Sequence, residues 1–237
     1  ATKEKARKKL DAFTYKIGYP DKWEDISDLE ISKDSYFANL KSMSVYFTKK
    51  NLAKIDEPVD KSEWGMGAHI VNAYYNPLNN EVVFPAGILQ PPFYNPEADA
   101  AINYGAIGGV IGHEFSHGFD DQGAKYGPDG NLENWWTDED KAQFETLTTQ
   151  LADQYSSYEV LPGVNVNGRL TLGENIADLG GLTLAYYAYQ NWKGDKEIEP
   201  IDGFTDEQRV FLGWAQVWQS NGRDEYFKNQ VTTDPHS

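Results

Sequence analysis

Apolar residues recur every three to four positions along much of the chain, a period that predicts helices. The first such segment places Ala6, Leu10 and Phe13 on one face, and we expect a helix from about residue 3 that ends near Gly18. Five further segments are interpreted as helices: 33–54, 99–119, 138–158, 173–189 and 206–219. Helical segments therefore dominate the predicted secondary structure.

The segment 33–54 carries an imperfect apolar stripe, for which core packing is the expected role. The stripe comprises Phe37, Leu40, Met43, Val45 and Phe47. The segment 99–119 carries glycines instead, at positions 105, 108, 109 and 112. Glycine costs a helix roughly 1 kcal/mol relative to alanine. We therefore expect these positions to let another element approach closely.

One hairpin interrupts the helical pattern. Residues 69–75 have the composition of a strand, residues 77–80 form a turn, and residues 81–84 return. An edge strand of this kind can bind an extended peptide through its main chain, although a hairpin more often has a purely structural role. The combined pattern predicts a mainly helical α+β fold.

Composition narrows the functional classes. The 237 residues carry a net charge of −16 and contain no cysteine. Nucleic acid and anionic membranes are poor partners for an acidic chain, and disulfides, thiol catalysis and cysteine-bound zinc are excluded. No apolar run is long enough to span a membrane. The charged start and abrupt end predict a fragment of a longer chain, acting as a monomer or associated with the missing parts.

The candidate chemistry lies in the sequence His113-Glu114-Phe115-Ser116-His117, which reads H-E-x-x-H. Residues four apart share one face of a helix, so His113 and His117 can direct two imidazoles at one zinc ion. Glu114 can then act as a general base. The motif is short enough to arise by chance, so the interpretation depends on a third ligand.

Two carboxylates near the start of the apolar helix 173–189 are candidates for this support. Glu174 is expected to be the third ligand, which leaves one zinc position open, as in catalytic sites. Its alternative role is to complement the helix dipole. Asp178 lies one turn later on the same face and can accept a hydrogen bond from a ligand histidine.

Four segments together resemble one known family. They are V-N-A-Y-Y-N-P at 71–77, F-P-A-G-I-L-Q-P-P-F at 84–93, V-I-G-H-E-F-S-H at 110–117 and G-E-N-I-A-D at 173–178. They resemble the neprilysin family of zinc endopeptidases, which includes endothelin-converting enzymes and bacterial oligopeptidases. The resemblance implies a thermolysin-like catalytic domain with one Zn²⁺ held by His113, His117 and Glu174. It also implies Glu114 as the base and Asp178 as support for a ligand histidine.

The resemblance extends to substrate contacts. It implies that Asn72 and Ala73 grip the substrate backbone and that His236 is the transition-state histidine, a residue that its own chemistry does not single out. The pocket for the residue after the scissile bond would be apolar and lined by Ile88, Phe93, Val110, Val217 and Trp218. A large hydrophobic substrate residue is therefore expected there.

These inferences predict a zinc endopeptidase that cleaves oligopeptides on the amino side of large hydrophobic residues. Residues 1–65 are expected to be a helical lead-in, and residues 66–237 a catalytic domain truncated at its C-terminus. One alternative is a zinc-binding remnant without turnover. Another is a zinc hydrolase that acts on non-peptide amides, but the edge strand at Asn72–Ala73 favours a peptide substrate instead. The absence of cysteine suggests a bacterial protein, secreted, periplasmic or in the cell envelope.

Overall fold

The computed structural model describes residues 1–236, which form two compact units. One unit combines Ala1–Gly18 with Gly67–Ser237, and the other is Tyr19–Met66. The expected division into a lead-in of residues 1–65 and a catalytic domain of residues 66–237 stays a prediction.

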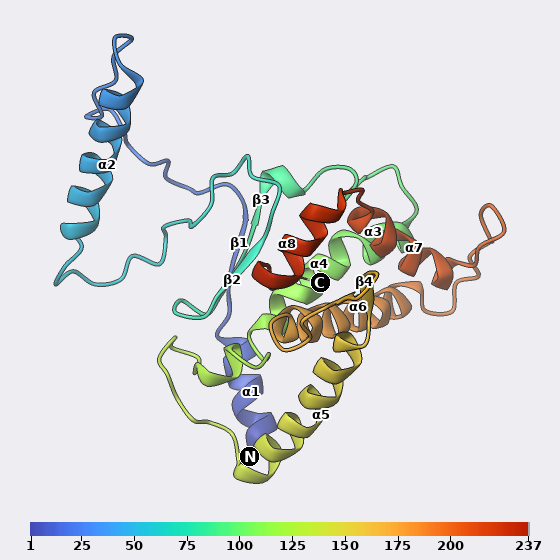
Figure 1. The fold of residues 1–237 in the computed structure, drawn as a ribbon. Helices are drawn as coiled ribbons and strands as arrows, with labels where there is room; N and C mark the ends of the chain where they lie inside the picture. Colours follow the sequence, from blue (N-terminus) through green and yellow to red (C-terminus); the bar gives the residue numbers. More distant parts are fainter. Residues whose placement is uncertain (237) are drawn as a thin grey trace. The chain divides into compact units, whose positions relative to one another are not determined.

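The larger unit is mainly helical with a small sheet, which confirms the predicted fold class (Figure 1). Its α-helices are α1 (Thr2–Asp11), α3 (Ala100–Gly105), α4 (Ile107–His117), α5 (Asp138–Ser156), α6 (Leu172–Lys193), α7 (Asp206–Trp218) and α8 (Asp224–Thr233). Its 3-10 helices are η1 (Ala86–Ile88) and η2 (Gly123–Lys125). Its strands are β1 (Thr14–Gly18), β2 (Tyr74–Asn76), β3 (Glu81–Pro85), β4 (Glu159–Leu161) and β5 (Val164–Asn165).

The three-stranded sheet has the order β1-β3-β2. The central strand β3 is buried throughout, pairs in parallel with β1 and pairs antiparallel with β2. The predicted hairpin is therefore present, but its first strand covers only Tyr74–Asn76 rather than residues 69–75. The reason is a turn just before it, in which the amide of Ile70 donates to the carbonyl of Gly67.

The first predicted helix is wrong in its second half, because α1 ends at Asp11 and residues 14–18 form β1. The amide of Thr14 donates to the carbonyl of Asn80 at 3.0 Å, which starts the parallel pairing with β3. The buried face of α1 also differs from the apolar face that the pattern indicated. Leu10 is 40% exposed, whereas Lys9 is 1% exposed.

The helix expected over residues 99–119 is two helices, α3 and α4. At the junction the amide of Ile107 donates to the carbonyl of Phe93, which removes it from the helical ladder. Ala106 between the helices has ψ −94°, outside the helical range.

Close packing of α4 on α6 explains why glycine occupies part of this segment. A Cβ added at Gly112 would lie 2.4 Å from the carbonyl oxygen of Gly181 on α6, and one added at Gly181 would lie 2.3 Å from the amide nitrogen of His113. The predicted close approach is thus confirmed at Gly112. It brings the backbone that carries His113 directly against α6.

A buried apolar cluster lies between the sheet and α4. Its members are Ala73, Val82, Phe84, Ile88, Ile107 and Val110. The cluster fixes α4 relative to β2 and β3, so the H-E-x-x-H helix and the hairpin share one core.

The smaller unit contains the helix α2 (Tyr36–Leu52), which begins at the N-cap Ser35. None of its residues is buried, and Phe37 is 76% exposed. The expected core packing of its stripe is therefore wrong for this chain. A single helix offers its own unit no second apolar surface to pack against. Among residues 1–236, no helix is both long and apolar enough to cross a membrane.

Candidate metal centre

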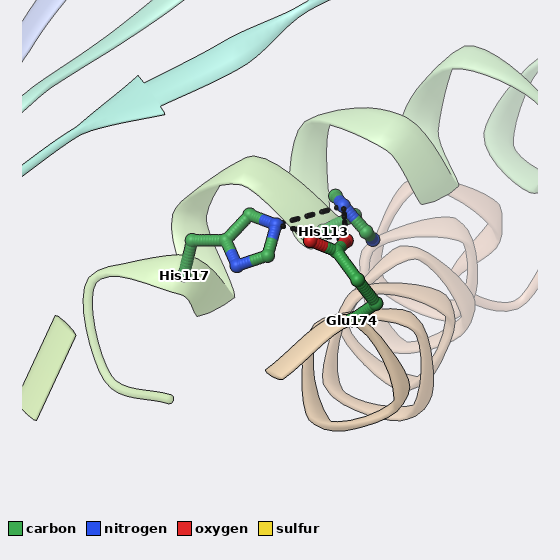
Figure 2. Close-up of side chains that lie close together, drawn as sticks. All are labelled: His113, His117 and Glu174. Atoms are coloured by element: carbon green, nitrogen blue, oxygen red, sulfur yellow. Dashed lines mark hydrogen bonds and ion pairs between the residues drawn. The ribbon is translucent and has the colours of Figure 1, made fainter. Parts of the chain in front are cut away.

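Three side chains from α4 and α6 converge on one point (Figure 2). His113 and His117 lie one turn apart on α4, with ring centroids 4.5 Å apart. Glu174 reaches them from the first turn of α6. Its Oε2 lies 3.3 Å from the Nε2 atom of each imidazole, and the two Nε2 atoms are 2.9 Å apart.

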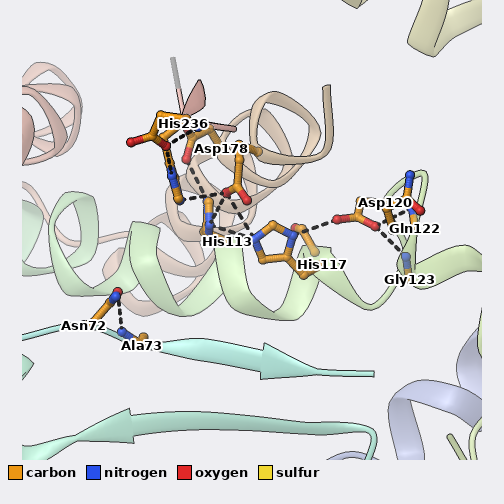
Figure 3. A network of polar contacts seen from close by, with 12 residues as sticks. Asn72, Ala73, His113, His117, Asp120, Gln122, Gly123, Asp178 and His236 are labelled. Carbon is orange, nitrogen blue, oxygen red and sulfur yellow. Dashed lines mark hydrogen bonds and ion pairs between the residues drawn. The ribbon is translucent and has the colours of Figure 1, made fainter. Parts of the chain in front are cut away.

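A carboxylate contacts Nδ1 of each imidazole and so orients the ring (Figure 3). Nδ1 of His113 lies 2.7 Å from Oδ1 of Asp178, one turn beyond Glu174 on α6. Nδ1 of His117 lies 2.7 Å from Oδ2 of Asp120. With Nδ1 occupied in both rings, the two Nε2 atoms face Glu174.

Asp120 is the site residue that the sequence interpretation missed. It lies in the turn after α4, and its Oδ1 accepts hydrogen bonds from the amides of Gln122 and Gly123 at 2.9 and 2.6 Å. The available signal was its spacing, since a carboxylate three residues after His117 can reach the same imidazole. The many turn-forming residues around it conceal that signal, because they indicate only a loop.

The carboxylates and imidazoles of the site shift one another's pKa values. Burial would lower the pKa of His113, but its contacts with Asp178 and Glu174 raise that pKa to about 9. Burial likewise opposes the shift at His117, whose pKa Asp120 and Glu174 raise to about 10. Burial would raise the pKa of Glu174, yet the two histidines hold it well below its usual range. The cluster therefore stabilises positive charge at its centre.

The residues fit a zinc ion. Tetrahedral zinc with bonds of about 2.0–2.1 Å places its ligand atoms about 3.3 Å apart, close to the observed triangle of 2.9, 3.3 and 3.3 Å. Oε2 of Glu174 is buried and accepts no hydrogen bond from any described residue. An orphaned carboxylate oxygen facing two nitrogen atoms is suited to a metal ion.

Glu114 lies beside this cluster and is 6% exposed. Burial raises its pKa, although His113 and His117 oppose the shift, and the backbone of Tyr75 in β2 also hydrogen-bonds the carboxylate. The motif glutamate thus stands between the histidines and the hairpin.

His236 approaches the centre from the residues that follow α8. Its Nε2 lies 3.4 Å from Oε2 of Glu174, and its Nδ1 lies 2.8 Å from Oδ1 of Asp234. Its side chain is 60% exposed. The structure thus brings this histidine to the same centre, with one face free toward solvent.

Asn72 and Ala73 precede β2 rather than lying within it. The side chain of Asn72 accepts a hydrogen bond from the amide of Ala73 at 2.9 Å (Figure 3). Asn72 is exposed and Ala73 is buried. The amide of Ala73 is therefore satisfied locally in this conformation.

Four of the five expected pocket residues are linked to one another by packing contacts. Ile88 and Val110 belong to the buried cluster, and Phe93 packs against it. The ring of Phe93 meets that of Trp218 edge-on, with centroids 6.3 Å apart. Val217 is half-buried on α7.

The fold and the histidine–carboxylate cluster define a zinc-metallopeptidase type of catalytic domain. The chain belongs to peptidase family M13, whose profile matches residues 72–237. This finding confirms the resemblance to the neprilysin family.

Two similar proteins of animals are an endothelin-converting enzyme homolog of Locusta migratoria, 47% identical, and neprilysin of Homo sapiens, 42% identical. Both alignments cover all of this chain but only 34% and 33% of the relatives. The chain thus spans about a third of the length of these relatives.

Two similar solved structures come from bacteria. A zinc metalloprotease Zmp1 of Mycobacterium tuberculosis, in complex with an inhibitor, has a TM-score of 0.96 and 50% identity. PepO of Lactobacillus rhamnosis has a TM-score of 0.85 and 38% identity. Each comparison covers all of this chain, and 37% and 36% of the solved chains. Because relatives occur in animals and bacteria, they do not establish the predicted bacterial origin.

Proposed function

We propose that this chain is the zinc-binding catalytic part of an endopeptidase that cleaves oligopeptides on the amino side of large hydrophobic residues. The observation that carries the proposal is the convergence of His113, His117 and Glu174, with the buried Glu114 beside them. Membership of family M13 supports it.

In this proposal the metal ligands are His113, His117 and Glu174. Bound zinc supplies a Lewis acid that polarises the scissile carbonyl and acidifies water. Glu114 accepts the proton of the attacking water and hands it to the leaving amine. Burial favours this role, because a carboxylate with a raised pKa is a stronger base.

The remaining roles belong to residues around the centre. Asp178 and Asp120 orient the two imidazoles, and His236 donates a hydrogen bond to the carbonyl oxygen as negative charge develops on it. The backbone of the substrate pairs beside β2, with Asn72 releasing the amide of Ala73 to do so. The side chain after the scissile bond occupies the apolar surface of Ile88, Phe93, Val110, Val217 and Trp218. We also propose that this activity is exerted outside the cytoplasm.

The test is hydrolysis of quenched oligopeptides by the zinc-loaded chain and by Glu114→Gln. We expect the variant to bind zinc as tightly as the parent and to lose about 10²–10⁴-fold in rate, the usual contribution of a general base. Peptides with phenylalanine or leucine after the scissile bond should be cleaved in preference to those with glycine or aspartate.

The second candidate function is a zinc-binding remnant that binds peptides or serves a structural role without turnover. It is favoured by the observation that the side chain of Asn72 already accepts a hydrogen bond from the amide of Ala73, which a substrate backbone would have to engage. If the zinc-loaded parent chain hydrolyses peptides no faster than zinc-loaded Glu114→Gln, this alternative is established.

A further inference from the structure

Lys9 is a buried cation outside the region that the family profile matches. It lies near the end of α1, is 1% exposed, and is separated from His117 by more than a hundred positions. Taking an ammonium group out of water is strongly unfavourable unless the surroundings compensate.

The surroundings of Lys9 explain how the charge is accommodated. Its Nζ donates hydrogen bonds to the carbonyls of Gly118 and Gly123 at 2.6 and 2.7 Å. The rings of Tyr75, Phe119 and Trp135 have centroids within 5.9 Å of Nζ. Cations over aromatic faces gain further stabilisation.

The two carbonyls bound by Lys9 lie at the two ends of one turn. Gly118 caps the end of α4 directly after His117, and Gly123 begins η2. Between them lies Asp120, whose carboxylate connects the amide of Gly123 to Nδ1 of His117 (Figure 3). The ammonium group of Lys9 therefore hydrogen-bonds both ends of the turn that carries Asp120.

The turn has little room to adopt another form. A Cβ added at Gly123 would lie 1.8 Å from the carbonyl oxygen of His117, and one added at Gly118 would lie 2.5 Å from the ring of Phe13. The backbone of Lys9 is itself held, since its carbonyl accepts a hydrogen bond at 3.0 Å from Nδ2 of the buried Asn80 side chain.

We propose that Lys9 is a positioning residue of the metal centre, which holds the turn Gly118–Gly123 so that Asp120 orients His117. The inference rests on the proposed zinc centre but not on peptide hydrolysis. It makes α1 part of the metal site, and it acts on the His117 side alone. His113 depends instead on Asp178, which α6 carries.

The test is a pair of double-mutant cycles with zinc affinity as the readout, measured by chelator competition on the folded chain. Lys9→Met and Asp120→Asn should each weaken zinc binding about 10-fold or more, as loss of residues that orient a ligand does. Combined, they should weaken it little more than the stronger single change, because both act through His117. Lys9→Met and Asp178→Asn act on different ligands, so their factors should multiply.

Two further variants separate positioning from general effects. Lys8 is the exposed neighbour of Lys9 on α1, and Lys8→Met should leave zinc affinity unchanged. Because the chain has no cysteine, Lys9→Cys can be aminoethylated selectively in denaturant and refolded, which restores an ammonium group of nearly the same reach. This form should recover the parent affinity.

Several results would overturn the proposal. They are a zinc affinity of Lys9→Met within about two-fold of the parent, equal multiplication with both aspartate variants, and no recovery on aminoethylation of a chain that folds. A zinc-free Lys9→Met that is unfolded by circular dichroism would assign Lys9 to folding instead. Failure of the proposed peptidase activity would be seen separately, as zinc-loaded parent chain that does not hydrolyse peptides.

Discussion

At the scale of single residues, the centre is built from pairs in which a carboxylate holds each imidazole. Asp178 contacts His113, and Asp120 contacts His117, both at 2.7 Å. Glu174 then faces two fixed Nε2 atoms, which is the condition for a preformed metal site.

Replacing Glu174 with glutamine should lower zinc affinity far more than removing a helix-dipole charge would. The control is Glu139→Gln, which removes an exposed carboxylate from the first turn of α5. A dipole contribution is about 0.3–1 kcal/mol and affects stability only. Zinc titration should show a loss of at least about 10-fold for Glu174→Gln and none for Glu139→Gln. Unchanged affinity in Glu174→Gln would remove it from the ligand set.

Lys9 should make the stability of the zinc-free chain depend on alkaline pH. Burial lowers its pKa from 10.5 to about 8, against the attraction of Asp120. Between these values the unfolded chain binds more protons than the folded chain, so the free energy of unfolding rises as pH increases through this window. The gain is at most about 3 kcal/mol.

The measurement is urea unfolding of the zinc-free parent and of Lys9→Met across that window. The parent should gain stability relative to the variant as pH increases. Two curves that stay parallel would show that the lysine titrates normally when folded.

The sequence was sufficient to predict those site residues that lie four positions apart on one helix. His113 and His117 are four apart, and Glu174 and Asp178 are four apart on another helix. Asp120 and Lys9 were not found, because their roles depend on a turn geometry and on a contact across the fold. No periodicity indicates that a lysine next to Leu10 is the buried member of the pair.

At the scale of elements, the contact of α4 with α6 sets the distance between the histidines and Glu174. The helices meet at Gly112 and Gly181, where neither position has room for a Cβ. Zinc affinity should therefore depend on residues that contribute no ligand atom to the metal.

Gly112→Ala should push α4 away from α6 and lower both stability and zinc affinity. Its control is Gly108→Ala on the same helix, where an added Cβ would have ordinary contacts of 3.5–3.8 Å. The control should be neutral or gain up to about 1 kcal/mol from helix propensity. Thermal unfolding with and without zinc measures both effects, and equal behaviour of the two variants would refute the close-packing account.

Elements marked by a local period or a local turn were predictable, whereas β1, which depends on pairing with a distant strand, was not. The helix predicted over residues 138–158 is present as α5, whose N-cap Thr137 accepts a hydrogen bond from the amide of Asp140. In contrast, residues 14–18 continue an apolar pattern that resembles a helix but pair with β3. The partner strand lies more than sixty positions away, so local propensity could not reveal it.

At the scale of the whole molecule, the centre belongs to one of two compact units. All candidate ligands lie in Ala1–Gly18 with Gly67–Ser237, and α2 lies in Tyr19–Met66. Binding of an ion stabilises the unit that binds it, by about 4 kcal/mol at a free concentration a thousand times the dissociation constant.

Hydrogen exchange should therefore respond to zinc in one unit only. Chelation should accelerate exchange of amides in α4 and in the first turns of α6, whereas amides of α2 should exchange equally fast with and without zinc. Protection of α2 by zinc would show that the two units unfold together.

X-ray absorption at the zinc edge of the loaded chain reports directly on the ligands of the ion. If His113, His117 and Glu174 hold one zinc ion, the spectrum should show two imidazole ligands at about 2.0–2.1 Å, with oxygen completing the coordination and no sulfur. A spectrum with one imidazole, or with three or more, would show that these residues are not the ligand set.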